Sequence, residues 1–437
     1  MPKGLQKIQF SFGANGLTQF GGISLFQQFC KFLSLRRFLQ THVQWSMRGK
    51  KRYHPVDLFL AHLFAIVAGI GRVENTQSLV HNGLLPPLLG LPDFPHRDTL
   101  RSFLWQIGHE TLDSLEIAHD KLRYYIFENL GPVYSGIVDV DSTVLPVYGH
   151  QQGARIGYNP GHRGKPSYNP IIASEERLGL TLNFELRSGN VHPATEAVSF
   201  LQCSLDKLPK TVSNTRTSIR ADASFYGKEF INYLDDNGLE YAIVARVTKP
   251  VKNILSGVSY KPFQDNWDVG EFQYQPCFWK KKHRFIGIRH LVEENDFPTT
   301  LFTVKGFTYR ALVTNLELNA QAVWRFYCER AQQELLIKEL KNNYTLAKIP
   351  TKSFLANQVY LEIVLWAYDL VMIFKHLCLP REYQNWTLST LRKNLWSLPA
   401  ELVHPGHHNR LRLPGKFPYQ DTFQYVKRMV SGTKPLM

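Results

Sequence analysis

Apolar residues recur at every third or fourth position through the first third of the chain. Residues with this spacing lie on one face of an α-helix, so the pattern predicts helices and argues against strands. We therefore predict an all-α N-terminal region over residues 1–132. Its predicted helices cover residues 23–39, 56–67, 99–107 and 111–130.

The pattern changes at Val133, where β-branched residues begin to alternate with small and polar ones, as is typical of strands. Three strands, a helix, a strand, a helix and a strand follow one another. This is the element order of a ribonuclease-H-like α/β fold, a mixed sheet flanked by helices, and we assign residues 133–249 to its first part. The strands are predicted over 135–148 (a strand and a further extended segment), 171–173, 178–187, 218–222 and 241–247, and the helices over 194–205 and 225–235.

Pro250 interrupts this series. Residues 250–306 hold strand-like, aromatic and basic segments, which predict a β-rich insertion. A strand at 309–314 resumes the core. Residues 319–343 contain no Pro or Gly and consist mostly of good helix formers, so they predict one helix directly after that strand.

The last part of the chain is first apolar and then basic. Residues 359–379 predict an apolar helix packed on the sheet, which completes a second part of the core at 307–379. Residues 380–437 are rich in Arg, Lys, His and Pro. They predict a basic C-terminal tail with one short helix at 391–398.

Composition limits the classes of function. The 437 residues carry a net charge of +15, and 20% of them are charged, which is typical of a folded protein with a polyanionic partner. The basic residues are spread over several segments, which disfavours a membrane surface as that partner. The apolar stretch 58–70 is too short to span a bilayer, and 359–379 contains charged residues. Residues 1–22 lack the apolar core of a signal peptide, so we expect a cytoplasmic protein.

No metal site of the zinc-finger kind is visible in the sequence. The cysteines are far apart and form no CxxC pair, so we expect buried free thiols in a reducing compartment. His404, His407 and His408 have no matching Cys/His pair and are interpreted as part of the basic tail. The cysteines are Cys30, Cys203, Cys277, Cys328 and Cys378.

The predicted helix 319–343 carries the most specific pattern. At about 100° per residue, one carboxylate, two cations and a phenol fall within roughly 60° of one another on the helical wheel. Glu329 and Glu339 point elsewhere. An ordinary solvated face with Glu/Lys pairs would also account for such a stripe. The four residues are Tyr327, Arg330, Glu334 and Lys341.

The spacing Y-x2-R-x3-E-x6-K resembles the signature of DDE transposases of the IS-4 type, which recurs in the related IS-1380 group of bacterial insertion sequences. The resemblance implies that Glu334 is a catalytic acid and that Arg330 and Lys341 contact DNA phosphates. Tyr327 would stack on or hydrogen-bond to the DNA, with Lys338 assisting from the same face. The family often has an aromatic residue after its Arg, where this chain has Ala331.

Two aspartates complete the implied set of catalytic acids. Asp141 ends a predicted strand in Asp-Ser-Thr, and the resembling transposases have their first catalytic Asp in such a context. Asp139 lies on the same strand face and is the rival assignment. Asp222 follows the strand 218–222 and matches the second Asp of the family, although a helix N-cap would also explain it.

The resemblance implies a mechanism and its partners. Two Mg2+ ions, for which Mn2+ can substitute, would be held by Asp141, Asp222 and Glu334, because Mg2+ prefers oxygen ligands. Two such ions can activate the attacking oxygen and stabilise the leaving oxygen when a phosphodiester is cleaved. The protein would bind the terminal inverted repeats of its element as double-stranded DNA, cleave them, and join the freed ends to target DNA. The resemblance also implies a homodimer in the synaptic complex and a nucleoid-associated protein in a bacterial cytoplasm.

Two further segments bear on DNA binding. The basic loop 48–52 and the N-cap signal at 95–99 are compatible with a helix-turn-helix DNA reader, whereas a helical bundle packed on the core fits them equally well. In the insertion, Lys280–Lys282 stand among Phe278, Trp279 and Phe285. Cations mixed with aromatics occur at sites that stack on bases, and also on hairpins whose basic edge prevents aggregation.

Three alternative functions stay open at this point. An inactive, domesticated relative would bind DNA without cutting it. A ribonuclease-H-fold nuclease would hydrolyse DNA without joining it. A glycosidase with paired carboxylates fits poorly with such a basic chain.

Overall fold

The computed structural model of the chain describes residues 16–47, 52–129, 136–159, 161–209, 217–291, 303–304, 306–405 and 409–432. The chain forms two compact units. One comprises residues 1–114, 343–350 and 359–437, and the other residues 115–342 and 351–358. The boundaries of the five parts expected from the sequence do not coincide with those of the two units, since the predicted parts 1–132 and 307–379 each have residues in both, and the five parts stay a prediction.

The first unit is mainly helical, and α3 lies in its core. His54 caps α3 by accepting a hydrogen bond from the Val56 N–H, and Gly69 ends the helix with a left-handed φ of 92°. The predicted helix 23–39 is broken, because Ser34 adopts a left-handed φ of 53° between α1 and α2. The spacing of apolar residues gives no sign of such a turn. The helices are α1 (Ile23–Phe32), α2 (Leu35–His42), α3 (Pro55–Ala68), α4 (Gln77–Val80), α5 (Leu85–Leu89) and α6 (Arg97–Gln106), with the 3-10 turn η1 (Val73–Thr76), and α7 (His109–Asn129) begins in this unit.

The end of the chain folds back into the same unit. β15 lies between β1 and β16, and α15 packs against α1. The sequence analysis expected no helix after residue 398, yet Phe423, Val426 and Val430 of α15 are buried and have helical spacing. The elements are β1 (Leu17–Thr18), α13 (Phe354–Cys378, of which residues 359–378 belong to this unit), α14 (Leu388–Leu391), the π-helix η5 (Arg392–Trp396), β15 (Ala400–Val403), β16 (Arg410–Arg412) and α15 (Gln420–Ser431).

A single helix able to cross a bilayer is not found in the described parts of the chain. The helices at Pro55–Ala68 and Val73–Val80 reach the required length and apolarity only when taken as one pair, which is bent by 96°.

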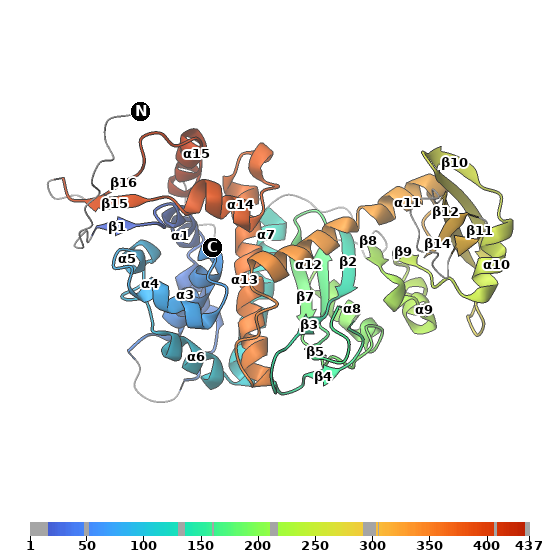
Figure 1. Ribbon diagram of the computed structural model, residues 1–437, viewed down its shortest axis with the longest axis horizontal. Helices are drawn as coiled ribbons and strands as arrows, with labels where there is room; N and C mark the ends of the chain where they lie inside the picture. Colours follow the sequence, from blue (N-terminus) through green and yellow to red (C-terminus); the bar gives the residue numbers. More distant parts are fainter. Residues whose placement is uncertain are drawn as a thin grey trace, which may run out of the picture. The chain divides into compact units, whose positions relative to one another are not determined.

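The second unit is built on one long sheet of order β10-β11-β12-β14-β9-β8-β2-β6-β7 (Figure 1). Strands β2, β6 and β7 are antiparallel neighbours, and β8 and β9 follow in parallel on the other side of β2. This arrangement of the first five strands confirms the ribonuclease-H-like fold class. These strands are β2 (Gly136–Ser142), β6 (Ile171–Glu175), β7 (Leu180–Glu185), β8 (Thr217–Ala221) and β9 (Glu240–Val244).

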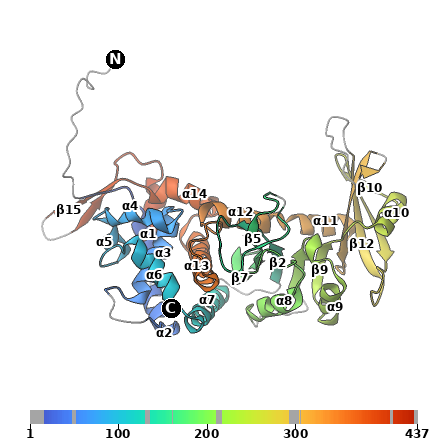
Figure 2. The ribbon, with the colours of Figure 1, turned by 60° about the horizontal axis from the view of Figure 1, so that its bottom comes forward.

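Helices and a small sheet accompany these strands. Figure 2 shows α8 and α9 on the side of the sheet opposite to α12. Gln333 of α12 contacts β6 through the Ser174 hydroxyl and the Ile172 carbonyl. The elements are α8 (Ala197–Asp206), α9 (Lys228–Asp236), α12 (Ala331–Asn343) and a three-stranded sheet of β3 (Leu145–Pro146), β5 (Pro166–Tyr168) and β4 (Arg155–Ile156).

The insertion continues the core sheet. β14 pairs with β12 over its whole length and with β9 over only three residues, so the inserted strands extend the sheet beyond β9 (Figure 1). The prediction of strands is confirmed, but the insertion begins with a helix, α10, that the sequence analysis did not expect. The elements are α10 (Lys249–Gly257), β10 (Lys261–Gln264), β11 (Trp267–Tyr274), β12 (His283–Leu291), β13 (Thr303–Val304) and β14 (Phe307–Thr314).

A buried histidine in α3 makes the stability of the first unit depend on pH. His62 is 2% exposed, and burial lowers its pKa from 6.5 to about 4. Since the unfolded chain takes up the proton first, the free energy of unfolding falls as pH drops from 6.5 towards 4, by about 3 kcal/mol at most for this group. Urea unfolding across this pH range should show that loss in the wild type. His62→Gln should lack this share of the pH dependence, and an unchanged slope would contradict the assignment.

Candidate catalytic site

Two aspartates leave the sheet side by side. Val140 of β2 is paired in parallel register with Ala221 of β8, so Asp141 and Asp222, the next residues, lie at the same edge of the sheet. Asp222 also caps the short helix η3 (Ala223–Phe225): its carboxylate accepts from the Ser224 N–H at 2.9 Å and from the Ser224 hydroxyl at 3.2 Å. The helix N-cap role that the sequence suggested for Asp222 is therefore present, and Asp222 also lies beside Asp141.

The signature residues come from two helices. The prediction of one helix over 319–343 is wrong, because α11 (Ala320–Cys328) ends before α12 begins at Ala331. At the break the Arg330 N–H donates to the Tyr327 carbonyl at 3.0 Å, a tighter turn than in an α-helix. We attribute the break to the Arg330 side chain, which is buried against Asp141. Glu and Arg are good helix formers, but helix propensity is a weak preference, and a tertiary contact of this kind outweighs it.

Arg330 joins two of the candidate acids. Its Nη2 lies 2.6 Å from Oδ2 of Asp141, and its Nη1 lies 3.3 Å from Oε1 of Glu334. The Arg330 side chain is 5% exposed and that of Glu334 is 68% exposed. Nε of Arg330 is buried and has no hydrogen-bond partner in the described part of the chain. The guanidinium thus supplies the positive charge between Asp141 and Glu334.

The acids influence one another electrostatically. Burial raises the pKa of Asp141 to about 6, the nearby Arg330 opposes this, and the negative charges of Asp222 and Glu334 add to it. Burial tends to lower the pKa of Arg330, but the attraction of Asp141, Tyr327 and Asp222 outweighs it and raises the pKa above its ordinary value. The charges of the three acids and of Arg330 are therefore coupled to one another.

Asp139, the rival first acid, has a different environment. Both of its oxygens lie 2.7 Å from the Arg220 guanidinium, and both side chains are almost completely buried. Arg220 also donates to the Phe326 carbonyl at 2.9 Å, which ties β8 to α11. This pairing accounts for Asp139 as a structural acid and favours Asp141 as the site residue.

The other predicted DNA contacts lie on both helices. Tyr327 is half-buried and stacks on Trp324, and burial raises its pKa to about 12, with Arg330 opposing. Lys341 is half-buried, and burial lowers its pKa while Asp141 opposes the shift. Lys338 is exposed. Their contacts with DNA stay a prediction.

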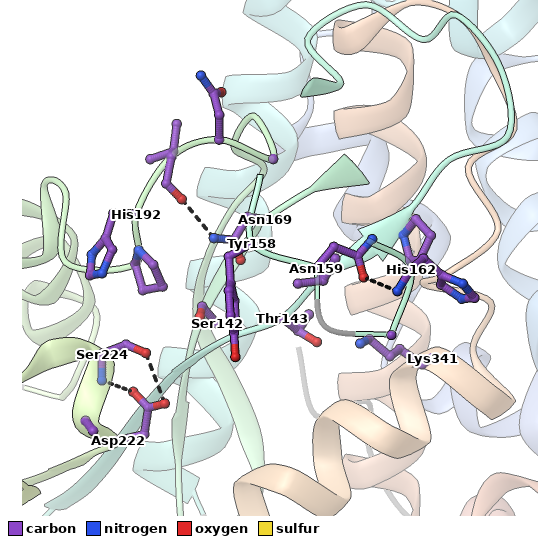
Figure 3. Close-up of a pocket in the computed structure, with 18 of the residues that line it drawn as sticks. Ser142, Thr143, Tyr158, Asn159, His162, Asn169, His192, Asp222, Ser224 and Lys341 are labelled. Atoms are coloured by element: carbon purple, nitrogen blue, oxygen red, sulfur yellow. Dashed lines mark hydrogen bonds between the residues drawn. The ribbon is translucent and has the colours of Figure 1, made fainter. Parts of the chain in front are cut away.

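A cavity of about 840 Å³ opens beside the carboxylates, and Asp222 and Lys341 form part of its wall (Figure 3). The sequence analysis assigned no site residue to the loop at 149–166, which is polar and rich in Gly. The density of Gly, His, Asn and Tyr in that loop was the available signal. The missed residues that line the cavity include Tyr158, Asn159, His162, His192 and Arg246.

The basic and aromatic segment of the insertion is largely engaged within the fold. Trp279 and Phe285 are buried, and Phe278 is exposed. Lys280 lies 3.0 Å from Asp236, and Lys281 lies 3.2 Å from Asp235, so both lysines form ion pairs at the end of α9. The basic loop at 48–52, apart from Arg52, and His407 and His408 lie outside the described residues.

The donor set suits a hard divalent cation by its chemistry, since its ligand atoms are carboxylate oxygens. Among the described residues no three His, Cys, Asp or Glu side chains already lie close enough to share one metal ion. In this structure the positive charge next to Asp141 and Glu334 is the guanidinium of Arg330.

Comparison with known proteins identifies the family. The family model described as transposase DDE domain group 1 matches residues 2–434. Among solved structures, a piggyBac transposase synaptic complex with hairpin DNA is similar at 12% identity and a TM-score of 0.47, covering 87% of this chain and 81% of that one. A Mos1 transposase paired-end complex with the left transposon end has 12% identity and a TM-score of 0.19, covering 45% and 60%.

A search of curated proteins gave no significant match. Both TM-scores are below 0.5, so the fold assignment rests on the strand order and the family assignment on the family model. The model spans nearly the whole sequence, and the chain belongs to the DDE transposase family.

Proposed function

We propose that this protein is the transposase of a bacterial insertion sequence of the IS-4 or IS-1380 type, active in the cytoplasm and bound to the nucleoid through DNA. It binds the terminal inverted repeats of its element, cleaves them, and transfers the freed 3′ ends to target DNA. The observation that carries the proposal is the placement of Asp141 and Asp222 at neighbouring strand ends, with Arg330 bridging from Asp141 to Glu334.

Asp141, Asp222 and Glu334 are the residues that would hold two Mg2+ ions in this site, and Mn2+ can replace them. When bound, such ions activate the attacking oxygen and stabilise the leaving one. The chain itself contributes the rigid placement of the two aspartates on the sheet and the flexible reach of Glu334 from α12. Lys338, which is exposed, and Lys341 both belong to α12, and we propose that they contact DNA phosphates.

DNA is the expected partner because the chain carries a net charge of +15 and belongs to a transposase family. The similar piggyBac structure is described as a synaptic complex. From the resemblance to IS-4-type transposases, we propose that two copies of this chain hold two element ends. If several Lys and Arg side chains contact phosphates, the logarithm of the affinity should fall linearly and steeply with the logarithm of salt concentration.

The deciding experiment is an assay with DNA that carries the element's own terminal repeats, with Mg2+ and with EDTA. The proposal expects cleavage and a strand-transfer product only with the metal. Cleavage without any joined product would favour a nuclease of the same fold. Salt-dependent binding without cleavage would favour an inactive DNA-binding relative. A flat salt dependence would contradict DNA binding altogether.

Arg330 is expected to compete with the metal. Since its guanidinium lies between Asp141 and Glu334, Arg330→Gln should increase the affinity for Mn2+ in the absence of DNA by about tenfold or more, which is about 1.4 kcal/mol. Isothermal titration measures this directly. Arg325→Gln, a change to an exposed arginine of α11, is the matched control and should leave the affinity unchanged. Equal Mn2+ affinities in wild type and Arg330→Gln would refute the competition.

A further inference from the structure

A second cavity lies wholly within the first unit, and none of the candidate acids lines it. Residues of α1, α2, α3 and the end of α5 form its wall. Leu60 and Phe64 of α3 and Leu89 of α5 make part of that wall apolar. Its volume of about 310 Å³ is at the lower end of the range for ligand pockets, roughly 300–1,000 Å³, so it suits one small molecule.

Gln27 of α1 brings an unsatisfied amide to this cavity. The residue lines the cavity and keeps 8% of its surface exposed, and its side-chain amide makes no hydrogen bond to any described residue. Gly90 leaves room for the amide, because a Cβ at Gly90 would lie 2.8 Å from Nε2 of Gln27. Buried amides are almost always hydrogen-bonded. A ligand that fills the cavity should therefore offer an acceptor to Nε2 and a donor to Oε1.

Positive charge gathers at the same cavity. Lys31, Arg36 and Arg37 all line it. Arg36 is paired with Asp57 and donates to the Gly90 carbonyl at 3.0 Å. Lys31 and Arg37 are exposed and have no carboxylate partner in the described part of the chain. Two cations are thus available to an anionic group at the rim of the cavity.

The start of α2 adds to this positive potential. Ser34 precedes the helix and also lines the cavity, and its side chain does not cap the helix. The first N–H groups of an uncapped helix keep their capacity to donate hydrogen bonds, and the helix dipole places partial positive charge there. Helix starts of this kind bind phosphate groups. The cations and the helix start therefore favour the same class of ligand group.

These features define the parts of the ligand. The apolar wall suits the face of a ring, Gln27 needs an edge with both a donor and an acceptor, and the cations need an anion. Glutamine pairs with adenine through such an edge, and Lys and Arg bind phosphate through charge-assisted hydrogen bonds. A lipid phosphate lacks the edge, and a sugar phosphate lacks the apolar face. An adenine nucleotide has all three parts.

We propose that this cavity binds one free adenine mononucleotide. The base lies against Leu60, Phe64 and Leu89 with its edge on Gln27, and the phosphate lies between Lys31, Arg37 and the start of α2. A ligand that binds only the folded state stabilises it, so the nucleotide strengthens the packing of the helices around the cavity. The site is independent of the DNA cleavage proposed above.

Isothermal titration of the full-length protein with AMP tests the site. EDTA is present throughout, so that metal ions cannot hold the phosphate at the carboxylates. Wild type should bind AMP about tenfold or more tightly than adenosine or inorganic phosphate, since each of these lacks one part of the ligand. Gln27→Leu and Arg37→Gln should each weaken AMP binding by about tenfold. Only Arg37→Gln should also reduce the preference for AMP over adenosine.

Gln28→Leu and Arg72→Gln are the matched controls. Gln28 is the next residue of α1, Arg72 is an exposed cation of the same unit, and neither lines the cavity, so both variants should bind AMP like wild type. Since Arg37 is exposed, its replacement should leave the protein folded even if Gln27→Leu does not. Absence of AMP binding, equal affinities for AMP and adenosine, or wild-type binding in both cavity variants would overturn the proposal.

A DNA surface is the competing interpretation of these cations. A duplex that carries the element's end is therefore added as a competitor. If the site is a nucleotide site, the duplex should leave AMP bound, and Arg37→Gln should bind the duplex like wild type. If the duplex displaces AMP and Arg37→Gln weakens both ligands equally, the rim contacts DNA and the nucleotide site is wrong.

Discussion

Glu334→Gln is expected to abolish metal-dependent DNA cleavage, with a loss of about a thousandfold or more in rate, while the protein stays folded and binds DNA. The expected loss is large because residues of a catalytic set act as a unit, so removal of one disables the others. Glu334 is 68% exposed and its contact to Arg330 is 3.3 Å long, so the substitution should change the free energy of unfolding little. The measurement is the single-turnover rate of cleavage with Mg2+.

Glu339→Gln is the matched control, since this acid lies on the same helix but points away from the signature stripe. It is expected to cut DNA at the wild-type rate. Asp141→Asn and Asp222→Asn should be as inactive as Glu334→Gln, because the three acids are proposed to act on the same phosphodiester. If Glu334→Gln still cuts, the third acid lies elsewhere on the chain. If neither the wild type nor any variant cuts DNA while all of them bind it, an inactive DNA-binding relative becomes the better interpretation.

The core of the fold could be predicted because its signals are local. The alternating residues of β2 and the β-branched residues in the short segments β6 and β8 mark strands without reference to the rest of the chain. Their order then restricts the sheet to few topologies. The strands of the insertion could also be predicted. The helix α10 was missed because Pro250 was interpreted only as a break, although Pro is common in the first turn of a helix and Val251 and Leu255 have helical spacing.

The site could be predicted only in part, because its geometry depends on contacts between distant residues. Nothing local breaks the helix at Glu329 and Arg330, and the cause is a pair that Arg330 makes with Asp141 of β2. The cavity was missed for a related reason. The positions of Tyr158 and Asn159 depend on the close packing of Gly157 on Gly189, and no periodicity in the sequence reveals that contact.

The choice between Asp139 and Asp141 shows the same limit. Both lie on one face of β2, so the alternation of the strand cannot separate them. The structure separates them by their partners. Asp139 lies opposite Arg220 in the parallel register of β2 and β8, and the two pair in the interior, whereas Asp141 lies at the strand end beside Asp222.

Asp139→Ala is therefore expected to destabilise the protein by about 3–5 kcal/mol, because it leaves the guanidinium of Arg220, which is 0% exposed, without its main counter-charge. Urea unfolding measures the change. Arg220→Met in the Asp139→Ala background should recover part of the loss, since a double change removes the uncompensated charge. Asp141→Asn is the contrasting variant: Arg330 keeps Glu334 as a partner, so stability should fall less while cleavage is lost. If Asp139→Ala instead proved stable and inactive, Asp139 would be the first catalytic acid, and its pair with Arg220 would have to open during the reaction.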